Sequence, residues 1–279
     1  MDSNDLLRLQ QTETEIMDVV DVFCREHDIP YTLYCGTALG AVRHGGFIPW
    51  DDDVDICIER AQYERFLELW SENPVDGYFL QGTRDCDVTT INHTKIRKDN
   101  TVFAGAFEHE REGAHHGIWI DIFPLDRVPK KKSLRKKLLF RAKLRLVYTR
   151  GYPITKRGKA LELLSKMMLA IPKRMQKRIK NKSEKAVTKY ADTTLDFDYM
   201  SLACPEDLAF IYPKTLFDGF TRVKFGDREY SLTTEYDAML RANYGDYMEL
   251  PPEEDRKPLH DPEVLIFDVA AQSGGGENA

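Results

Sequence analysis

The sequence has 279 residues, a length that suits one large domain or two small ones. Its content of 42% hydrophobic and 11% aromatic residues excludes wholesale disorder. The longest apolar runs are shorter than the roughly 18 residues of a membrane span, so no transmembrane helix is expected. The N-terminal residues lack a secretory signal, and the five scattered cysteines form no Cys-x-x-Cys pair. A cytoplasmic protein without disulfides is therefore expected.

The net charge of −6 hides an uneven distribution along the chain. The segment 127–189 contains 23 lysines and arginines but only two acids, Glu162 and Glu184, so its net charge is +21. The other residues hold 17 basic and 44 acidic side chains, a net charge of −27. This division indicates that one segment faces an anionic surface.

Hydrophobic periodicity and turn residues divide the chain into helices and strands. In chain order, helices are expected at Leu6–His27, Thr37–His44, Arg60–Ser71 and Thr234–Asn243. Strands are expected at Tyr31–Cys35, Val54–Ile58, Tyr78–Gln81, Thr90–Arg97, Ile118–Phe123, Arg222–Phe225 and Glu229–Leu232. In the basic segment, apolar and basic residues share a helical spacing over Ser133–Tyr148 and Lys159–Ile171. This pattern predicts two or three helices inserted into an α/β core.

The most informative segment is 49–56, with the sequence PWDDDVDI. Side chains alternate along a strand, so Asp53 and Asp55 are expected to point the same way. Adjacent carboxylates repel one another, and a bound divalent cation removes that penalty. Carboxylate oxygens are ligands that favour Mg²⁺ or Mn²⁺. The alternative to a metal site at this segment is a solvated acidic turn. An EF-hand loop is excluded, because Ile56 and Gln62 stand where it requires Gly and Glu.

Gly36 and Thr37 lie at an expected strand-to-helix turn, where backbone N–H groups and a hydroxyl can hold a phosphate oxygen. A Gly-Thr turn, a spacer and then Asp53-Val-Asp55-Ile resemble the arrangement of nucleotidyltransferase-fold enzymes. Those enzymes complete their metal site with a carboxylate from a separate strand. Asp121, which apolar residues flank, is the expected third carboxylate; the alternative is an ordinary acid at a strand end.

Four segments, in order along nearly the full chain, resemble the LicD family. They are YTLYCGTALGAVRHGGFIPWDDDVDI at 31–56, Lys95-Ile-Arg97, GIWIDIFPLD at 117–126 and YGDYMELPPEE at 244–254. The first is long and specific. The family includes bacterial phosphocholine transferases and is related to fukutin-type ribitol-phosphate transferases.

The resemblance implies an α/β (α+β) fold with a nucleotidyltransferase-like mixed sheet flanked by helices. On this basis 1–126 and 201–271 are expected to form the catalytic core. The helical spacing of the basic segment makes 127–200 a basic helical insertion, and the Gly-rich composition of 272–279 predicts a disordered tail. The zinc-binding insertion of the fukutin-related branch has no matching cysteine cluster here.

The resemblance also implies a reaction. Family members take an alcohol phosphate such as phosphocholine from a CDP-linked donor, place it on a sugar hydroxyl and release CMP. Their acceptors are cell-surface glycans such as teichoic acid or lipopolysaccharide. On the family motif, Asp53, Asp55 and Asp121 are the expected ligands of Mg²⁺ or Mn²⁺, and the acids at 51 and 52 match it with less defined roles.

The donor's phosphates require cationic and polar partners. Arg43, Lys95 and Arg97 are candidates, together with Gly36 and Thr37, because Arg offers a planar fork and Lys a point charge. Each of the three basic residues could equally be a surface charge.

The basic segment admits three interpretations: a nucleic-acid surface, a membrane surface and a solvated face. Its Lys and Arg are interleaved with Leu and Met rather than with stacking aromatic residues, which favours an anionic membrane over nucleic acid. Peripheral contact with the inner face of a membrane is therefore expected. A nucleic-acid partner is not expected.

Two rival functions stay open. A true nucleotidyltransferase would use the same carboxylates, keep the nucleotide on the acceptor and release pyrophosphate. A nucleic-acid-binding module on a decayed transferase fold is the non-enzymatic alternative, against which the intact acidic set argues.

Overall fold

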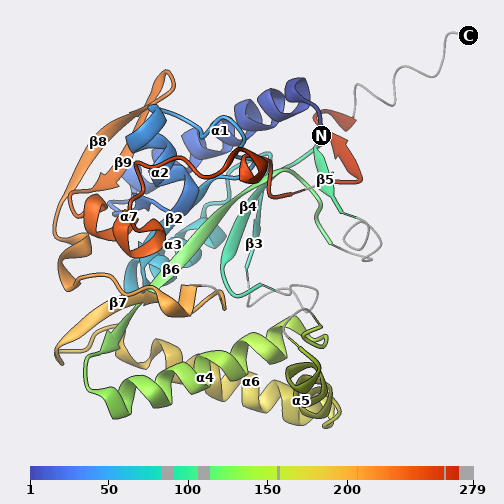
Figure 1. Cartoon of the computed structure of the whole chain (residues 1–279), viewed down its shortest axis with the longest axis vertical. Coiled ribbons are helices and arrows are strands. Elements are labelled where there is room, and N and C mark those ends of the chain that lie inside the picture. Colours follow the sequence, from blue (N-terminus) through green and yellow to red (C-terminus); the bar gives the residue numbers. More distant parts are fainter. Residues whose placement is uncertain (83–90, 106–113, 156–157, 206, 261, 270–279) are drawn as a thin grey trace, which may run out of the picture.

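The computed structural model describes residues 1–82, 91–105, 114–155, 158–205, 207–260 and 262–269. Its centre is a mixed β-sheet flanked by helices, as the sequence predicted, with a separate layer of helices at one end (Figure 1). In spatial order the sheet contains β1 (Thr32–Leu33), β2 (Asp55–Glu59), β6 (Trp119–Pro129), β4 (Thr94–Lys98) and β3 (Tyr78–Gln81). β7 (Phe197–Ser201) pairs with the second half of β6.

The register of three strands meets at Asp121. β2 and β6 run parallel and pair Asp55 with Asp121, whereas β4 runs antiparallel on the other side of β6 and pairs Lys95 with Asp121. Three polar side chains from distant parts of the sequence are therefore neighbours in the sheet.

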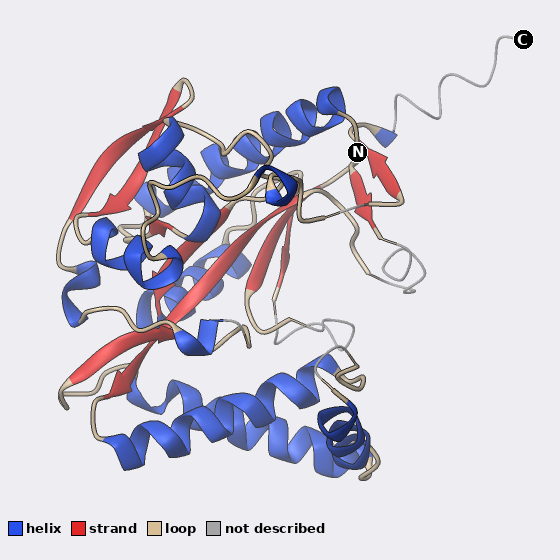
Figure 2. Cartoon of the chain, in the orientation of Figure 1, coloured by secondary structure: helices blue, strands red, loops and turns tan. Residues whose placement is uncertain are grey.

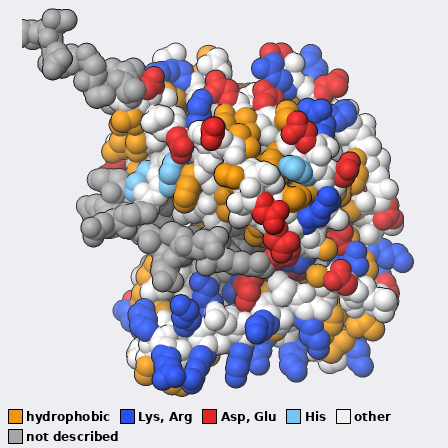
Figure 3. All heavy atoms as spheres, turned by 180° about the vertical axis from the view of Figure 1, so that it is seen from behind, with side chains coloured by type: hydrophobic (Ala, Val, Ile, Leu, Met, Phe, Trp, Pro, Cys, Tyr) orange, Lys and Arg blue, Asp and Glu red, His pale blue; other side chains and the backbone are white. Residues whose placement is uncertain are grey.

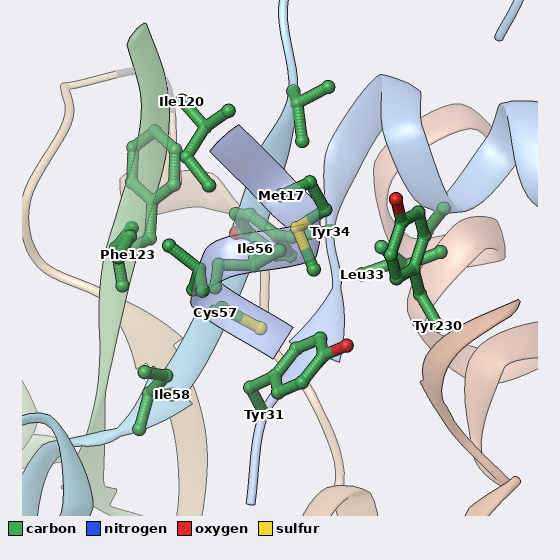
Figure 4. Packing of buried hydrophobic residues seen from close by; sticks show 14 of the residues in the cluster. Met17, Tyr31, Leu33, Tyr34, Ile56, Cys57, Ile58, Ile120, Phe123 and Tyr230 are labelled. Atoms are coloured by element: carbon green, nitrogen blue, oxygen red, sulfur yellow. The ribbon is translucent and has the colours of Figure 1, made fainter. Parts of the chain in front are cut away.

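The core forms where apolar side chains of the central strands meet the covering helices. Ile56 and Ile58 of β2 and Ile120 of β6 are fully buried. Figure 4 shows them in one cluster with Met17 and Tyr34. Burial on this scale stabilises the fold by about 25 cal/mol for each Å² of apolar surface removed from water.

Two helices that cover the sheet contact each other through aromatic side chains. α1 (Ser3–Glu26) begins where the Asp2 carboxylate accepts hydrogen bonds from the first free N–H groups of the helix. The ring centre of its residue Phe23 lies 5.5 Å from that of Phe66 and 4.7 Å from that of Trp70, both on α3 (Arg60–Glu72). The helical spacing of apolar residues predicted both helices.

A second group of elements surrounds α2 (Cys35–His44). It comprises the hairpin of β8 (Phe220–Phe225) and β9 (Arg228–Thr233) and the helix α7 (Tyr236–Tyr244). α2 ends at Gly45, whose φ of 69° favours glycine, and whose carbonyl accepts the N–H of Gly226 at 2.7 Å. The strand expected at Tyr31–Cys35 is only two residues long, because α2 already begins at Cys35.

The segment between β6 and β7 forms three helices: α4 (Lys132–Arg150), α5 (Lys159–Leu169) and α6 (Lys173–Val187). We call these three helices the basic layer. Figure 2 shows them grouped together at one end of the sheet. A small separate core joins the layer to the sheet, made of Val128, Leu138, Ala142, Val187, Met200 and Leu202. The expectation of two or three inserted helices is confirmed, and the expected tail 272–279 lies outside the described residues.

The remaining elements are short. β5 (Val102–Ala104) and β10 (Val264–Ile266) form a two-stranded sheet that the sequence did not predict. In the described part of the chain, short 3₁₀ helices span Thr188–Tyr190, Asp207–Ala209, Lys214–Phe217 and Glu253–Asp255. The described helices include none that combines the length and apolarity needed to cross a bilayer.

Candidate active site

Three consecutive acids open the site. Asp51, Asp52 and Asp53 follow the turn after α2 and lead into β2, and each offers a carboxylate oxygen within 4.8 Å of those of the other two. β2 begins only at Asp55, so Asp53 lies just before the strand rather than on it. The Asp52 carboxylate accepts the backbone N–H groups of Leu259 at 3.1 Å and His260 at 2.7 Å. The Asp52 side chain thus anchors a distant segment of the chain.

The first turn of α2 holds the next carboxylate in place. The Thr37 hydroxyl accepts the backbone N–H of Asp55 at 2.8 Å, and the Asp55 carbonyl accepts the N–H of Tyr34 at 2.9 Å. Gly36 faces Asp51: a Cβ at this glycine would lie 2.7 Å from Asp51 Oδ2. A side chain at position 36 would therefore move the Asp51 carboxylate away from the helix turn. Gly36 and Thr37, the expected phosphate-binding residues, lie directly beside the acids.

Asp121 is surrounded by cationic and donor groups. Its carboxylate lies 2.7 Å from His93 Nε2 and 3.0 Å from Lys95 Nζ, and it accepts Trp119 Nε1–H at 2.9 Å. Burial alone would raise the pKa of Asp121, but the positive charges of Lys95 and His93 hold it well below its usual range. Asp121 is thus kept ionised.

The other acids repel one another. Burial, with the charges of Asp53 and Asp52, raises the pKa of Asp51 to about 8. Burial raises the pKa of Asp53 to about 6, although the charge of His260 opposes it. Burial and the charge of Asp53 also raise the pKa of Asp55. A divalent cation would remove these penalties, because it supplies the missing positive charge.

The donor set fits such a cation. The side chains are carboxylates, which are the hard oxygen ligands that Mg²⁺ and Mn²⁺ prefer. Asp51 Oδ2 is a buried atom without a hydrogen-bond partner among the described residues. An unpaired buried carboxylate oxygen is costly, so a site that leaves one open is suited to receive a ligand.

A cavity of about 530 Å³ opens next to Asp51. Gly36, Trp50, Arg43 and Tyr244 are among its lining residues. Arg43 Nη1 donates to the backbone carbonyl oxygens of Tyr247 at 2.8 Å and Glu249 at 3.1 Å. These hydrogen bonds hold one wall of the cavity in place. Arg43 is therefore at the cavity, where the donor-binding prediction needs it.

Lys95 and Arg97 have different environments, although they share a face of β4. Lys95 Nζ pairs with Asp121 and lies 3.9 Å from the centre of the Trp119 ring. Arg97 is buried, with Nε donating to Gln81 Oε1 at 2.6 Å and Nη1 to the Gly117 carbonyl at 2.7 Å. Lys95 thus lies at the acids, whereas Arg97 joins β4 to neighbouring backbone and side chains.

Sequence reasoning missed three residues of this region: Glu13, His93 and His260. His93 had a usable signal, because it alternates with Lys95 and Arg97 at the spacing of a strand face. Glu13 had one too, because it interrupts the apolar face of α1. His260 lies in irregular chain far from the motifs, and no sequence signal points to it.

The fold and these residues define an α/β protein with a carboxylate-rich site at the junction of β2 and β6. Residues 28–146 match the family described as LicD/FKTN/FKRP, nucleotidyltransferase domain. The chain is 30% identical over 278 residues to the lipopolysaccharide cholinephosphotransferase LicD of Haemophilus influenzae, covering 94% of this chain and 99% of that protein. The chain belongs to the LicD family.

Two shorter similarities involve Rickettsia. An uncharacterised protein of Rickettsia typhi is 39% identical over 56 residues, which is 20% of this chain and 18% of that protein. One of Rickettsia prowazekii is 32% identical over 81 residues, covering 28% of this chain and 30% of that protein. These segments are too short to bear on function.

Proposed function

We propose that this protein transfers phosphocholine from a CDP-linked donor to a sugar hydroxyl of a cell-surface glycan of the lipopolysaccharide type, releasing CMP. One observation carries the proposal. The acidic site lies beside an open cavity in a chain that resembles a lipopolysaccharide cholinephosphotransferase over 94% of its length. Choline as the alcohol and lipopolysaccharide as the acceptor come from that relative's name.

Asp53, Asp55 and Asp121 would hold Mg²⁺ or Mn²⁺. When bound, such a cation neutralises charge on the phosphate oxygens and on the leaving CMP. Asp121 would serve as a ligand in its ionised form, which His93 and Lys95 maintain. The buried position of the other acids favours loss of their protons only when a cation is present.

The chain's own residues would orient the donor for in-line attack by the sugar hydroxyl on phosphorus. The cavity beside Asp51 has room for part of a CDP-alcohol, and its aromatic wall includes Trp50 and Tyr244. Arg43 and Lys95 would face the diphosphate, together with the first turn of α2 at Gly36 and Thr37. Positioning and charge neutralisation then provide most of the catalysis.

Product analysis tests this function. The full chain is incubated with CDP-choline, Mn²⁺ and lipopolysaccharide, and the nucleotide product is identified by chromatography. We expect CMP to accumulate with phosphocholine on the glycan. A parallel reaction with CTP and phosphocholine tests the rival nucleotidyltransferase activity. If the mixture with CTP releases pyrophosphate and the mixture with CDP-choline releases no CMP, the protein is a nucleotidyltransferase and the proposed transfer of phosphocholine is wrong.

We further propose that the basic layer binds an anionic membrane, where a lipid-linked acceptor is found. Figure 3 shows Lys and Arg side chains gathered over this layer. Large apolar side chains are exposed among them, including Leu163 (62% exposed) and Met167 (64%) on α5. Exposed apolar groups set among basic ones are typical of helices that lie on an anionic bilayer.

A further inference from the structure

Two acids occupy the core-facing side of α1, Glu13 and Asp21. Asp21 is fully satisfied: Arg222 Nη1 donates to Oδ1 at 2.5 Å, Arg25 Nε donates to Oδ2 at 3.0 Å, and the Tyr31 hydroxyl also donates. Its burial is explained by this ion-pair network. No comparable explanation applies to Glu13.

Glu13 is only 2% exposed, and its Oε2 is buried without a hydrogen-bond partner among the residues that the structure describes. Burial raises the pKa of Glu13, and the negative charges of four other acids raise it further; they are Asp53, Asp52, Asp51 and Asp121. A buried acid among like charges is unfavourable unless a cation joins it.

A hydrogen bond fixes α1 against this part of the site. Gln10 Nε2 donates to the Asp51 carbonyl at 2.8 Å. Glu13 follows Gln10 by three residues and so lies on the same side of the helix. The N-terminal half of α1 therefore presents its one unpaired buried carboxylate toward the acids at 51–53.

We propose that Glu13 supplies an additional carboxylate oxygen to the cation-binding site of Asp51, Asp53, Asp55 and Asp121. Cation binding then links α1 to the sheet, so that this helix is part of the metal site. The inference rests on the proposed function for the presence of a divalent cation, but it concerns binding and not turnover.

Mn²⁺ binding to the full chain tests the inference, measured by calorimetry and by thermal unfolding without donor. We expect Glu13→Gln to weaken Mn²⁺ binding by on the order of 10-fold to 100-fold. Without metal, the same variant should unfold at the same temperature as wild type or higher, because its amide carries no charge among the acids. Glu15→Gln is the matched control: Glu15 is on the same helix, 57% exposed, and pairs with Lys98, so neither quantity should change.

A second measurement needs no variant. Hydrogen exchange of the wild-type chain should slow at residues 10–16 when Mn²⁺ is added, because the cation ties α1 to the site. Unchanged exchange in α1, or Mn²⁺ affinity of Glu13→Gln within twofold of wild type, would overturn the inference. Mn²⁺ binding through Glu13 without CMP release supports this inference and removes the proposed function. If the wild-type chain releases CMP but the Glu13→Gln variant binds Mn²⁺ normally, the proposed function stands and this inference is wrong.

Discussion

Asp55 on β2 and Asp121 on β6 are direct partners in a parallel register, although the chain between them includes a helix and two other strands of the sheet. Paired residues of neighbouring strands direct their side chains to the same face of the sheet. Burial makes the pair unfavourable when both are charged. Lys95 on β4 forms an ion pair with Asp121, but it lowers the pKa of Asp55 less than burial and the other acids raise it. This relationship supports the proposal that a cation binds at the site.

The first prediction concerns Asp53 and Asp55, two of the acids that we propose as metal ligands. Asp53→Asn and Asp55→Asn should each abolish CMP release while the protein stays folded, because a negative ligand is lost. Without metal, both variants should unfold at the same temperature as wild type or higher, since repulsion is reduced. Asp227→Asn, at an exposed acid of the hairpin turn, is the control. Full activity of either variant at limiting Mg²⁺ would remove that residue from the metal site.

Gly36 provides a test that leaves every charge in place. In Gly36→Ala the new methyl group would meet Asp51 Oδ2 at 2.7 Å and displace this carboxylate. Activity should fall by about 100-fold, the effect of a misplacement near 1 Å in an active site, with little change in stability. Gly105→Ala is the matched control, because a Cβ there meets nothing within 4 Å. Equal activity of the two variants would show that the position of Asp51 is unimportant.

Much of the fold follows from local patterns, as the fully buried residues Leu9, Ile16 and Val20 of α1 illustrate. β6 was predicted only to Phe123, because Pro124 usually ends a strand. N–H groups along a strand point alternately to its two edges. The N–H of Asp121 points to β2, so the N–H that Pro124 lacks, three residues later, would have pointed to the opposite edge of β6. On that edge β4 pairs only as far as Ile122 and β7 begins at Leu125. The proline thus lies between two partners, where no donor is needed.

The site was predictable only where residues share a motif. Asp53 and Asp55 stand in one segment, and Asp121 is flanked by isoleucines that mark a buried strand. Glu13 and His260 reach the acids through tertiary packing of α1 and of irregular chain near the C-terminus. A single sequence does not encode such contacts in any local period.

Asp126 should behave unlike Asp121, although both lie on β6. Arg60 donates to it twice, from Nε at 2.7 Å and Nη2 at 3.0 Å, and both side chains are buried. Asp126→Asn should therefore lower the free energy of unfolding by about 3 kcal/mol, because Arg60 loses its buried partner and keeps Glu64, which is partly exposed. Urea unfolding measures this loss. A stable but inactive variant would instead assign Asp126 to the active site.

Asp21 predicts a pH dependence of stability. Burial alone would raise the pKa of Asp21, but hydrogen bonds from Arg222 and Tyr31 lower it below the usual value. In the unfolded chain the Asp21 carboxyl has a pKa of about 3.9, so it binds a proton more readily there than in the folded chain. The stabilisation is present above that pH and is lost as pH falls through it toward the folded pKa.

The measurement compares urea midpoints between about pH 6 and pH 3. Asp21→Asn should be less stable at the upper end and lose less stability on acidification than wild type. Glu72→Gln, at an exposed acid ending α3, should follow the wild-type curve. Parallel curves for Asp21→Asn and wild type would contradict the assignment.

The last prediction concerns the basic layer and separates its charges from its apolar groups. Replacing Lys173, Arg174 and Lys177 of α6 with Gln should weaken binding to vesicles that contain anionic lipid, at about 1 kcal/mol per basic residue. Wild-type binding should fall as salt rises, because the Debye length is only about 8 Å at physiological ionic strength. Leu163→Gln with Met167→Gln should weaken binding at every salt concentration, since the apolar contribution is not screened.

Vesicle flotation measures these effects, with neutral vesicles as the lipid control. Leu7→Gln is the protein control, because Leu7 is 53% exposed on α1, outside the basic layer. None of these variants touches the acidic site, so release of CMP from CDP-choline with a soluble acceptor should stay at the wild-type rate. If the wild-type chain does not float with anionic vesicles even at low salt, the membrane proposal is wrong. Binding to lipopolysaccharide that survives in that case would identify the layer as a surface for the anionic acceptor itself.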